Sequence, residues 1–443
     1  MSARISRRPD TNADGRNTLL ALYEERLMGV LERATRSGTM RFTYAPAWRE
    51  ASGAFPLSLS LPLAREQHTH DAILRVLDGY LPDRSDIREQ LARDHQVAAG
   101  DVFGLISALG EDCPGAIAFV RPSRREAFVK AVSPSVAWLS EAALANRLRA
   151  LGGPGAPARL TGDGGYFSLA GAQPKIALYE AKGRWGIPRG GTPTTHILKP
   201  PLGKKPEFLL AELIGLRLAA AIGLSAASAN VLHVEDQWVL SVQRYDRVKQ
   251  SGRWRRVHQE DICQALGVSP TLKYESTGAP GIAQIVRLLR AHSQRAAEDI
   301  ETFLDMIALN WIIVGTDAHA RNYSVLIGAG GTARLAPCYD VATAYGVARA
   351  SNVREARMAM QIGGEYIALN VSAQEWHRLA EAINLAPSQL LARVNAVAQR
   401  VELSVHALQA QFDTELTPEF AQLAGRALTR ISKRARTCAA AIG

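Results

Sequence analysis

The sequence predicts an α+β protein with two lobes, a strand-rich lobe followed by a helical one. Three observations predict this: short β-type runs recur between residues 158 and 258, helical spacing of apolar residues dominates after residue 280, and a Gly/Pro-rich break (LGGPGAP, 151–157) precedes both. With 443 residues the chain is long enough for two or three domains. We therefore expect a small α+β N-terminal region (1–155), a β-rich lobe (156–258) and an all-helical C-terminal lobe (259–443), interrupted only by one hairpin, with a natural cleft between the lobes.

Each part of the chain has its own pattern. In the N-terminal region, 18–36 has helix-like spacing, 37–63 alternates like short strands broken by prolines, and 71–98 returns to helical spacing. The next lobe combines β-type runs at 174–180, 195–200 and 230–246 with one strong helix at 207–223. The last lobe is predicted to contain helices at 280–295, 296–314, 373–384, 387–411 and 417–440, and a hairpin at 323–337 with glycines at its turn.

Composition excludes several classes of protein. Hydrophobic residues make up 47% and charged residues 21%, which excludes a largely disordered chain. Long apolar runs are interrupted by charged or amide side chains, and the start lacks the apolar segment of a secretory signal, so we expect no membrane contact and a cytoplasmic location. Four cysteines without CxxC pairing predict neither a zinc site nor a disulfide framework.

The charge balance is basic. Lys and Arg number 52 against 42 Asp and Glu, a formal charge of +10, and only nine of the basic residues are lysine. Two explanations stay open: an arginine-rich composition that reflects a GC-rich genome, or an acidic partner such as nucleic acid, which a positive field would attract.

The strongest candidate site is TDAHARN at 316–322. Apolar residues at helical spacing precede it, Gly315 is expected to end that helix, and Asp317 and Asn322 then lie in a loop before a strand. The hairpin that follows should return the chain so that Asp340 lies near Asn322. Aspartate and amide oxygens of this kind suit Mg²⁺, which takes its other ligands from water and phosphates.

The order and spacing of Asp317, Asn322 and Asp340 match those of the catalytic and metal-binding residues of protein kinases. The flanking letters differ, because the HRD, DFG and GxGxxG motifs are absent. The alternative is that these residues have only a structural role, in an Asx turn that ends the helix and at the polar end of a strand.

Further residues fit a phosphate-binding lobe. Lys199 ends the β-type run THILK, on the strand face opposite Leu198, and Glu212 in the following helix could pair with it. The alternative is that Lys199 only extends its ammonium group to solvent and that Glu212 is a solvated surface residue. The glycine-rich stretch 161–178 leads into a strand and contains Lys175, a combination that suits phosphate contact but is weak alone. Residues 241–245 (SVQRY) would form a hinge between the lobes.

Together these pieces resemble the HipA family, the serine/threonine-kinase toxins of bacterial type II toxin–antitoxin modules. The resemblance covers nearly the whole chain, and only the ordered set is specific. Its pieces are GYLPDR (79–84), GEDCPGA (110–116), SLAGAQPK (168–175), TPTTHILKP (192–200), RYDR (244–247), HQEDICQALG (258–267), KYESTGAPG (273–281), GTDAHARNYSV (315–325) and PCYD (337–340).

The resemblance implies roles for individual residues. Asp317 would be the catalytic base, Asn322 and Asp340 the Mg²⁺ ligands, Ser168 the inhibitory autophosphorylation site, and Glu212 the ion-pair partner of Lys199. The implied ATP-binding residues are Ala170, Gly171, Ala172, Gln173, Lys175, Lys199, Gln243, Arg244, Tyr245, His319, Asn322, Tyr339 and Asp340. Gln243 departs from the glutamate expected in such hinges, which leaves a backbone contact but puts a side-chain contact in doubt.

The resemblance also implies partners: a helix-turn-helix antitoxin, operator DNA bound through the toxin–antitoxin complex, and a protein substrate, with aminoacyl-tRNA synthetases among the substrates of the family. Two other interpretations stay open. One is a DNA-associated co-repressor subunit with weak or no kinase activity, and the other is a small-molecule phosphotransferase on the same fold. Retention of Asp317, Asn322, Asp340 and Lys199 favours a working kinase.

Overall fold

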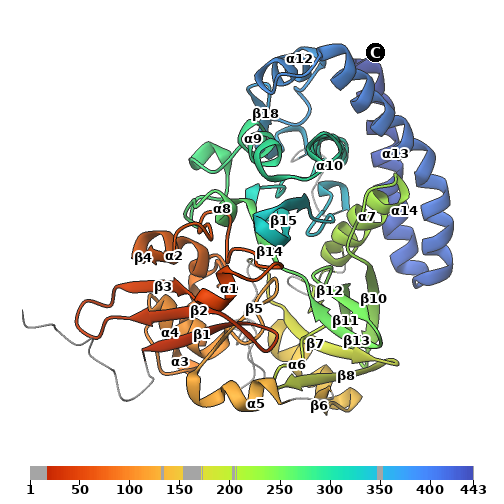
Figure 1. Ribbon diagram of the computed structural model, residues 1–443. Coiled ribbons are helices and arrows are strands. Elements are labelled where there is room, and N and C mark those ends of the chain that lie inside the picture. The colour runs from red at the N-terminus through yellow and green to blue at the C-terminus, as the bar shows by residue number, and fades with distance from the viewer. Residues whose placement is uncertain are drawn as a thin grey trace, which may run out of the picture.

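The computed structural model describes residues 17–130, 134–152, 171, 173–201, 205, 207–346 and 353–442. It shows an N-terminal region, a second sheet beside it and a helical lobe above both (Figure 1). This is the expected α+β bilobed arrangement with an additional N-terminal region. Within the described ranges, none of the helices combines the length and apolar character needed to span a membrane.

The N-terminal region is a five-stranded antiparallel sheet in the order β4-β3-β2-β1-β5, with short helices packed beside it. Its elements are β1 (Thr18–Tyr23), β2 (Arg26–Arg33), β3 (Met40–Tyr44), α1 (Pro46–Arg49), β4 (Gln67–Thr69), α2 (His70–Asp78), α3 (Ser85–Asp94), α4 (Val102–Leu109), β5 (Ile117–Val120), η1 (Pro122–Arg124) and α5 (Arg125–Val129).

The helix-like pattern expected over 18–36 is wrong, because this segment is the β1–β2 hairpin. Both faces of strand β1 bury apolar residues, because Leu19 and Ala21 belong to the main core and Leu22 to a smaller cluster, so strand alternation is hidden. The turn offers no glycine signal either. Glu24 takes the left-handed conformation there, with φ 53°.

The second sheet has six antiparallel strands in the order β10-β11-β9-β7-β8-β6. Strand β6 and helix α6 precede the predicted boundary at residue 155, yet they belong to this sheet by packing: Leu144 and Leu148 are buried against Ile176 and Leu198. The elements are β6 (Ser135–Trp138), α6 (Glu141–Gly152), β7 (Ile176–Ala181), β8 (Arg184–Arg189), β9 (His196–Lys199), α7 (Glu207–Ala221), β10 (Ala229–Val234) and β11 (Gln237–Gln243), followed by the separate hairpin β12 (Arg247–Gln250) and β13 (Arg253–Arg256).

The C-terminal lobe is mainly helical but not all-helical. The expected hairpin is present as β15 and β16, and β14 adds a third strand to it. A second hairpin, β17–β18, was not expected, since its strands are short and polar at their ends. The elements are β14 (Gln259–Asp261), α8 (Ile262–Ala265), η3 (Glu275–Thr277), α9 (Ile282–His292), α10 (Ala296–Ile313), η4 (Ala320–Asn322), β15 (Ser324–Ile327), η5 (Ala329–Gly331), β16 (Ala333–Leu335), η6 (Ala344–Gly346), β17 (Arg357–Ile362), β18 (Glu365–Ile367), α12 (Ala373–Ala382), α13 (Pro387–Glu415) and α14 (Pro418–Ile442).

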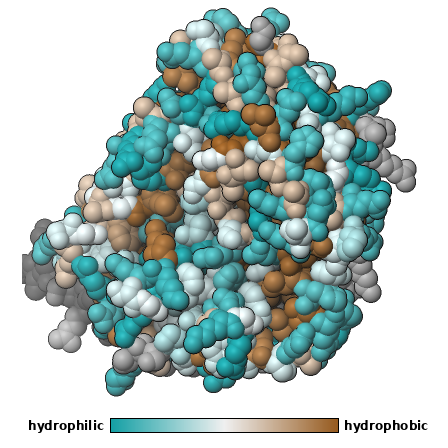
Figure 2. All heavy atoms as spheres, turned by 90° about the vertical axis from the view of Figure 1, so that its right-hand side faces the viewer, coloured by the Kyte–Doolittle hydropathy of each residue, from teal (hydrophilic) through white to brown (hydrophobic). Residues whose placement is uncertain are grey.

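The hydrophobic core joins the N-terminal region to the helical lobe. One continuous cluster contains Leu77 and Phe119 of the first, and Trp311 and Phe412 of the second. The second sheet has a smaller core of its own. The long pair α13–α14 lies at the outside of the helical lobe, and the face that it borders is mostly hydrophilic with scattered apolar patches (Figure 2).

Candidate active site

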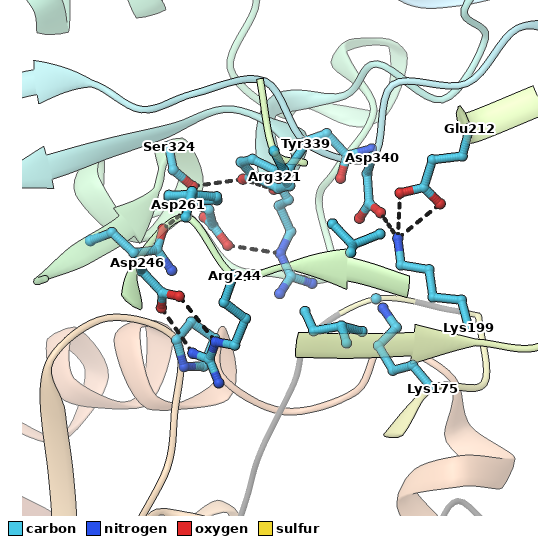
Figure 3. A pocket seen from close by; sticks show the side chains of 18 of the residues that line it. Lys175, Lys199, Glu212, Arg244, Asp246, Asp261, Arg321, Ser324, Tyr339 and Asp340 are labelled. Carbon is cyan, nitrogen blue, oxygen red and sulfur yellow. Dashed lines mark hydrogen bonds and ion pairs between the residues drawn. The ribbon is translucent and has the colours of Figure 1, made fainter. Parts of the chain in front are cut away.

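A cavity of about 130 Å³, partly open to solvent, lies where the three regions meet. Residues of the second sheet and α7, the hinge after β11, and the loops around η4 and β16 line it (Figure 3). Among the residues singled out by sequence, those lining the cavity are Gly171, Lys175, Lys199, Glu212, Gln243, Arg244, Tyr245, His319, Asn322, Tyr339 and Asp340.

At one end of the cavity Lys199 joins two carboxylates. Its Nζ donates to Glu212 Oε1 at 2.7 Å and Oε2 at 3.0 Å, and also to Asp340 Oδ1. Burial disfavours the charge of Lys199, but Asp340 and Glu212 outweigh it and raise its pKa above the usual value. Burial likewise opposes ionisation of Asp340, yet Lys199 and Lys175 hold its pKa well below the usual range. Burial raises the pKa of Glu212, which shares the Lys199 charge with Asp340. The result is a charge cluster in which Lys199 and Glu212 are buried and Asp340 borders the cavity.

Lys175 brings a second ammonium group toward the same corner (Figure 3). Burial lowers its pKa, and Asp340 acts in the opposite direction. Gly171 has φ +104°, a backbone conformation that favours glycine, and it lies close to the mobile end of Lys175. Gln173 is not among the residues that line the cavity, and its side-chain amide donates to the Pro200 carbonyl at 3.1 Å. Ser168, Ala170 and Ala172 lie outside the described residues.

The loop after α10 presents Asp317 at the surface. The helix ends at Ile313 with Val314 in the left-handed conformation, φ 54°, one residue before the expected Gly315. A Cβ at Gly315 would collide with Asn310, so a close contact explains this glycine. The Asp317 side chain is 64% exposed, and its Oδ1 accepts from the Tyr274 hydroxyl at 2.8 Å.

Asn322 and His319 complete this loop. Asn322 Nδ2 donates to the Asp317 carbonyl at 2.7 Å, which leaves the amide oxygen as the ligand atom. His319 is buried, with Nε2 3.9 Å from Asp317 Oδ1, and burial lowers its pKa, so the imidazole is neutral at pH 7. Its ring meets the Tyr274 ring edge to face at 5.4 Å.

The donor set fits a magnesium ion. Asn322 and Asp340 both line the cavity and offer hard oxygen atoms, the ligands that Mg²⁺ prefers. Among the described residues no three His, Cys, Asp or Glu side chains gather as a metal cluster. A metal held there would therefore take its other ligands from water and substrate phosphates.

The hinge forms the opposite end of the cavity. The backbone N–H groups of Gln243 and Arg244 donate to Ser228 and Thr195 carbonyls at 2.8 and 2.9 Å. The Tyr245 ring stacks on Tyr339 at 5.3 Å. The Tyr339 hydroxyl contacts Ser324 Oγ at 2.6 Å and donates to the Arg321 carbonyl at 2.9 Å. These two rings form a wall of the cavity rather than offering their hydroxyl groups to a ligand.

Behind the hinge lies a buried cluster that sequence analysis did not detect. Asp112 accepts from Arg247 at 2.9 Å and from Arg256 at 3.1 Å, and Arg244 pairs with Asp246 at 2.8 Å. The Arg244 guanidinium is therefore committed to the protein, as are its backbone N–H and carbonyl groups, which pair with Thr195 and Arg247. Burial opposes ionisation of Asp112, but the three arginines hold its pKa below the usual range.

Three further residues near the loop were also missed. Asp83, from the N-terminal region, contacts Arg321, and Asp261 accepts from Arg321 at 3.1 Å. Tyr274 touches Asp317 directly. The motifs GYLPDR, HQED and KYE contain these residues, but their letters alone assign no contact.

A two-lobed α+β fold with a cavity at the hinge between lobes places the chain in the protein-kinase-like class of folds. The chain belongs to the HipA family. The HipA N-terminal domain matches residues 19–120 and the HipA-like C-terminal domain matches residues 167–405, which is more than half of the chain.

Relatives and solved structures agree with this membership. A Sinorhizobium fredii protein provisionally named kinase Y4mE is 34% identical over 362 residues, covering 81% of this chain and 84% of that protein. The serine/threonine-protein kinase toxin HipA of Shewanella oneidensis is 26% identical over 402 residues, covering 86% of each. The structure of the Shewanella oneidensis HipA, HipB and operator DNA complex matches the fold with TM-score 0.81 and 24% identity, over 96% of this chain and 98% of that chain.

Proposed function

We propose that the chain is an ATP- and Mg²⁺-dependent serine/threonine protein kinase that acts as the toxin of a bacterial toxin–antitoxin pair. The observation that carries the proposal is the cluster of Lys199, Glu212 and Asp340 in a cavity that also borders Asn322 and the hinge. Relatives named as kinases support the reaction class, and the relative named as a HipA toxin supports the biological role.

In this proposal the acceptor hydroxyl lies against Asp317, whose carboxylate orients it and accepts its proton. The hydroxyl oxygen forms a bond to the γ-phosphorus while the bond from that phosphorus to the bridging oxygen of ADP breaks. Lys199 stabilises phosphate charge, and Glu212 holds Lys199 in place. Asn322 and Asp340 would hold Mg²⁺, which neutralises phosphate charge when bound.

Phosphate transfer is tested with the full-length protein. We expect wild type to transfer phosphate from Mg-ATP to protein serine or threonine, and intact mass to rise by one phosphate through modification at Ser168. Asp317→Asn should lose both, because the hydroxyl loses its base, whereas Asp413→Asn on the exposed face of α13 should keep both. Ser168→Ala should lose only the mass increase. Full activity in Asp317→Asn would refute the assignment, and transfer to small molecules alone would favour the phosphotransferase interpretation.

The toxin role has a separate test. Expression of wild type should slow bacterial growth, Asp317→Asn should not, and co-expression of a helix-turn-helix antitoxin should restore growth. Phosphoproteome comparison of the two strains would identify the acceptor, with aminoacyl-tRNA synthetases as the first group to inspect. Growth arrest by Asp317→Asn would contradict a role that depends on kinase activity.

A co-repressor role is the second candidate, favoured by the solved HipA, HipB and DNA complex and by the charge of +10. We expect the chain to bind operator DNA together with its antitoxin, with affinity that falls steeply as salt rises. Asp317→Asn should leave this binding unchanged, since the base is not a phosphate-backbone contact. Gel-shift titration at several salt concentrations measures it, and binding that depends on Asp317 would contradict the separation of the two roles.

A further inference from the structure

The N-terminal region reaches the candidate catalytic loop through one carboxylate. Asp83 lies between α2 and α3, and its side chain is 14% exposed. Its Oδ1 accepts from Arg321 NH1, and its Oδ2 accepts from Lys273 Nζ at 3.3 Å. Arg321 is separated from Asp83 by 238 positions of the chain, so this contact joins two distant parts of the molecule.

Arg321 fixes the loop from its buried side. It directly precedes Asn322, and its side chain is 4% exposed. Besides Asp83, it donates to the Gly79 carbonyl at 2.8 Å and to Asp261 Oδ2 at 3.1 Å. Two of these three partners come from the N-terminal region. The Arg321 carbonyl also accepts from the Tyr339 hydroxyl, so both the side chain and the backbone of this residue are held.

Lys273 provides a second connection from Asp83 to the loop. The next residue, Tyr274, donates its hydroxyl to Asp317 Oδ1 at 2.8 Å. Asp83 therefore contacts both segments that bear on Asp317: the loop that carries it and the segment whose tyrosine touches it. Because Asp317 itself is largely exposed, its direction depends on these few contacts.

The support under Asp83 is rigid. Ile73, Val76 and Leu77 of α2 and Leu81 of the loop are fully buried, and they belong to the same core as the helical lobe. Burial disfavours ionisation of Asp83, but Arg321 and Lys273 hold its pKa below the usual value, so it stays charged at neutral pH. Without it, Arg321 would keep the Gly79 carbonyl and a single carboxylate, Asp261, whose own pKa is raised by burial.

We propose that Asp83 is a positioning residue for phosphoryl transfer, through which the N-terminal region holds the 317–322 loop and the Tyr274 segment in register with the cavity. This inference rests on the proposed kinase function. The N-terminal region then contributes to the reaction itself, because one of its carboxylates fixes the 317–322 loop.

The test compares Asp83→Asn with Asp86→Asn in the full-length protein. Asp86 lies in the first turn of α3 on the surface, and its carboxylate accepts from Arg84 at 2.9 Å, away from the loop. We expect kcat to fall about tenfold to a hundredfold in Asp83→Asn, because small misplacement of a catalytic group has effects of this size. The Kd for a non-hydrolysable ATP analogue should stay close to wild type, whereas the thermal midpoint should fall, because Arg321 loses one partner of a buried ion pair. Asp86→Asn should match wild type throughout.

A double-mutant cycle separates positioning from a general structural role. Tyr274→Phe removes the contact to Asp317. Because both substitutions act on the same loop, the kcat loss of the Asp83→Asn, Tyr274→Phe double variant should be smaller than the product of the two single losses. Asp83→Glu, which keeps the charge, should recover part of kcat. Unchanged kcat in Asp83→Asn, measured below its thermal midpoint, or a kcat loss matched by weaker analogue binding, would overturn the proposal. No transfer by wild type would instead overturn the kinase function on which it rests.

Discussion

Ion pairs form both ends of the cavity, but the two ends differ in how far their charged side chains are exposed. At the phosphate end, one lysine meets Glu212 and Asp340, and the Asp340 side chain is 33% exposed to the cavity. At the hinge end, Arg244, Arg247 and Arg256 surround Asp112 and Asp246, and every one of these side chains is 8% exposed or less.

This difference distinguishes residues that are expected to act on a substrate from residues that stabilise the fold. The phosphate-end groups border open space, so a substrate can exchange with their present partners. The hinge-end groups are closed off, and their partners come from the N-terminal region and from the segment after β11. Loss of a phosphate-end charge should therefore reduce turnover, whereas loss of a hinge-end charge should reduce stability.

The largest effect is expected at the hinge end. Asp112→Asn leaves three buried arginines with Asp246 as the remaining carboxylate, and removal of one partner from a buried ion pair costs about 3–5 kcal/mol. Because its pKa is lowered in the folded state, the contribution of Asp112 is present above about pH 4 and is lost as pH falls further. Urea unfolding at pH 7 measures it. Asp236→Asn, on an exposed pair with Arg149, is the control, and an equal loss there would contradict the contrast.

At the phosphate end, Lys199→Met should lower kcat by roughly 10²–10³-fold, the usual effect of removing one preorganised charge from a transition state. Stability should change less than in Asp112→Asn, because Asp340 borders solvent and Glu212, with its raised pKa, takes up a proton readily. Steady-state kinetics and urea unfolding of the same preparations measure both quantities. A stability loss without a kcat loss would reverse the assignment of the two ends.

The contrast between the two ends shows what sequence can predict. Lys199, Glu212, Asp317, Asn322 and Asp340 were selected because each has a residue type and spacing that suit phosphoryl transfer, and the fold places them around one cavity or at its edge. Most helices of the C-terminal lobe were likewise predicted within a few residues, since their apolar periodicity is strong.

The features that sequence did not reveal depend on distant partners or unusual backbone. Asp112 and Arg247 are 135 positions apart, and no local pattern indicates that they meet. The same is true of Asp83 and Arg321. The β1–β2 turn was missed because a glutamate, not a glycine, takes its left-handed position. Contacts of this kind are properties of the packed chain rather than of any segment.

Another buried carboxylate sharpens the comparison, because it faces no cation of either cluster. Glu260 on β14 is fully buried and accepts from the Leu59 N–H at 2.8 Å. Burial raises its pKa from 4.5 to about 8. Its folded state therefore holds a proton that the unfolded state releases, and stability should fall as pH rises from about 4.5 to 8.

Glu260→Gln should remove this dependence, so that the variant gains stability over wild type by on the order of 2 kcal/mol at pH 8.5 and by much less at pH 5. Urea unfolding at the two pH values measures the difference. Glu50→Gln, at an exposed glutamate of the N-terminal region, should show no such pH-dependent gain. Equal effects of Glu260→Gln at both pH values would show that Glu260 is already ionised in the fold.

The smallest effect is expected where the hinge borders the cavity. Gln243 ends β11, and its N–H is committed to the Ser228 carbonyl at 2.8 Å. If the hinge binds the nucleotide through backbone groups, Gln243→Ala should raise the KM for ATP by less than about fivefold, equivalent to one ordinary hydrogen bond at most. Gln243→Glu, which restores the carboxylate expected in related hinges, should change it equally little. A tenfold or larger rise in Gln243→Ala would show that the side chain holds the nucleotide, and the hinge end would then be reactive as well as structural.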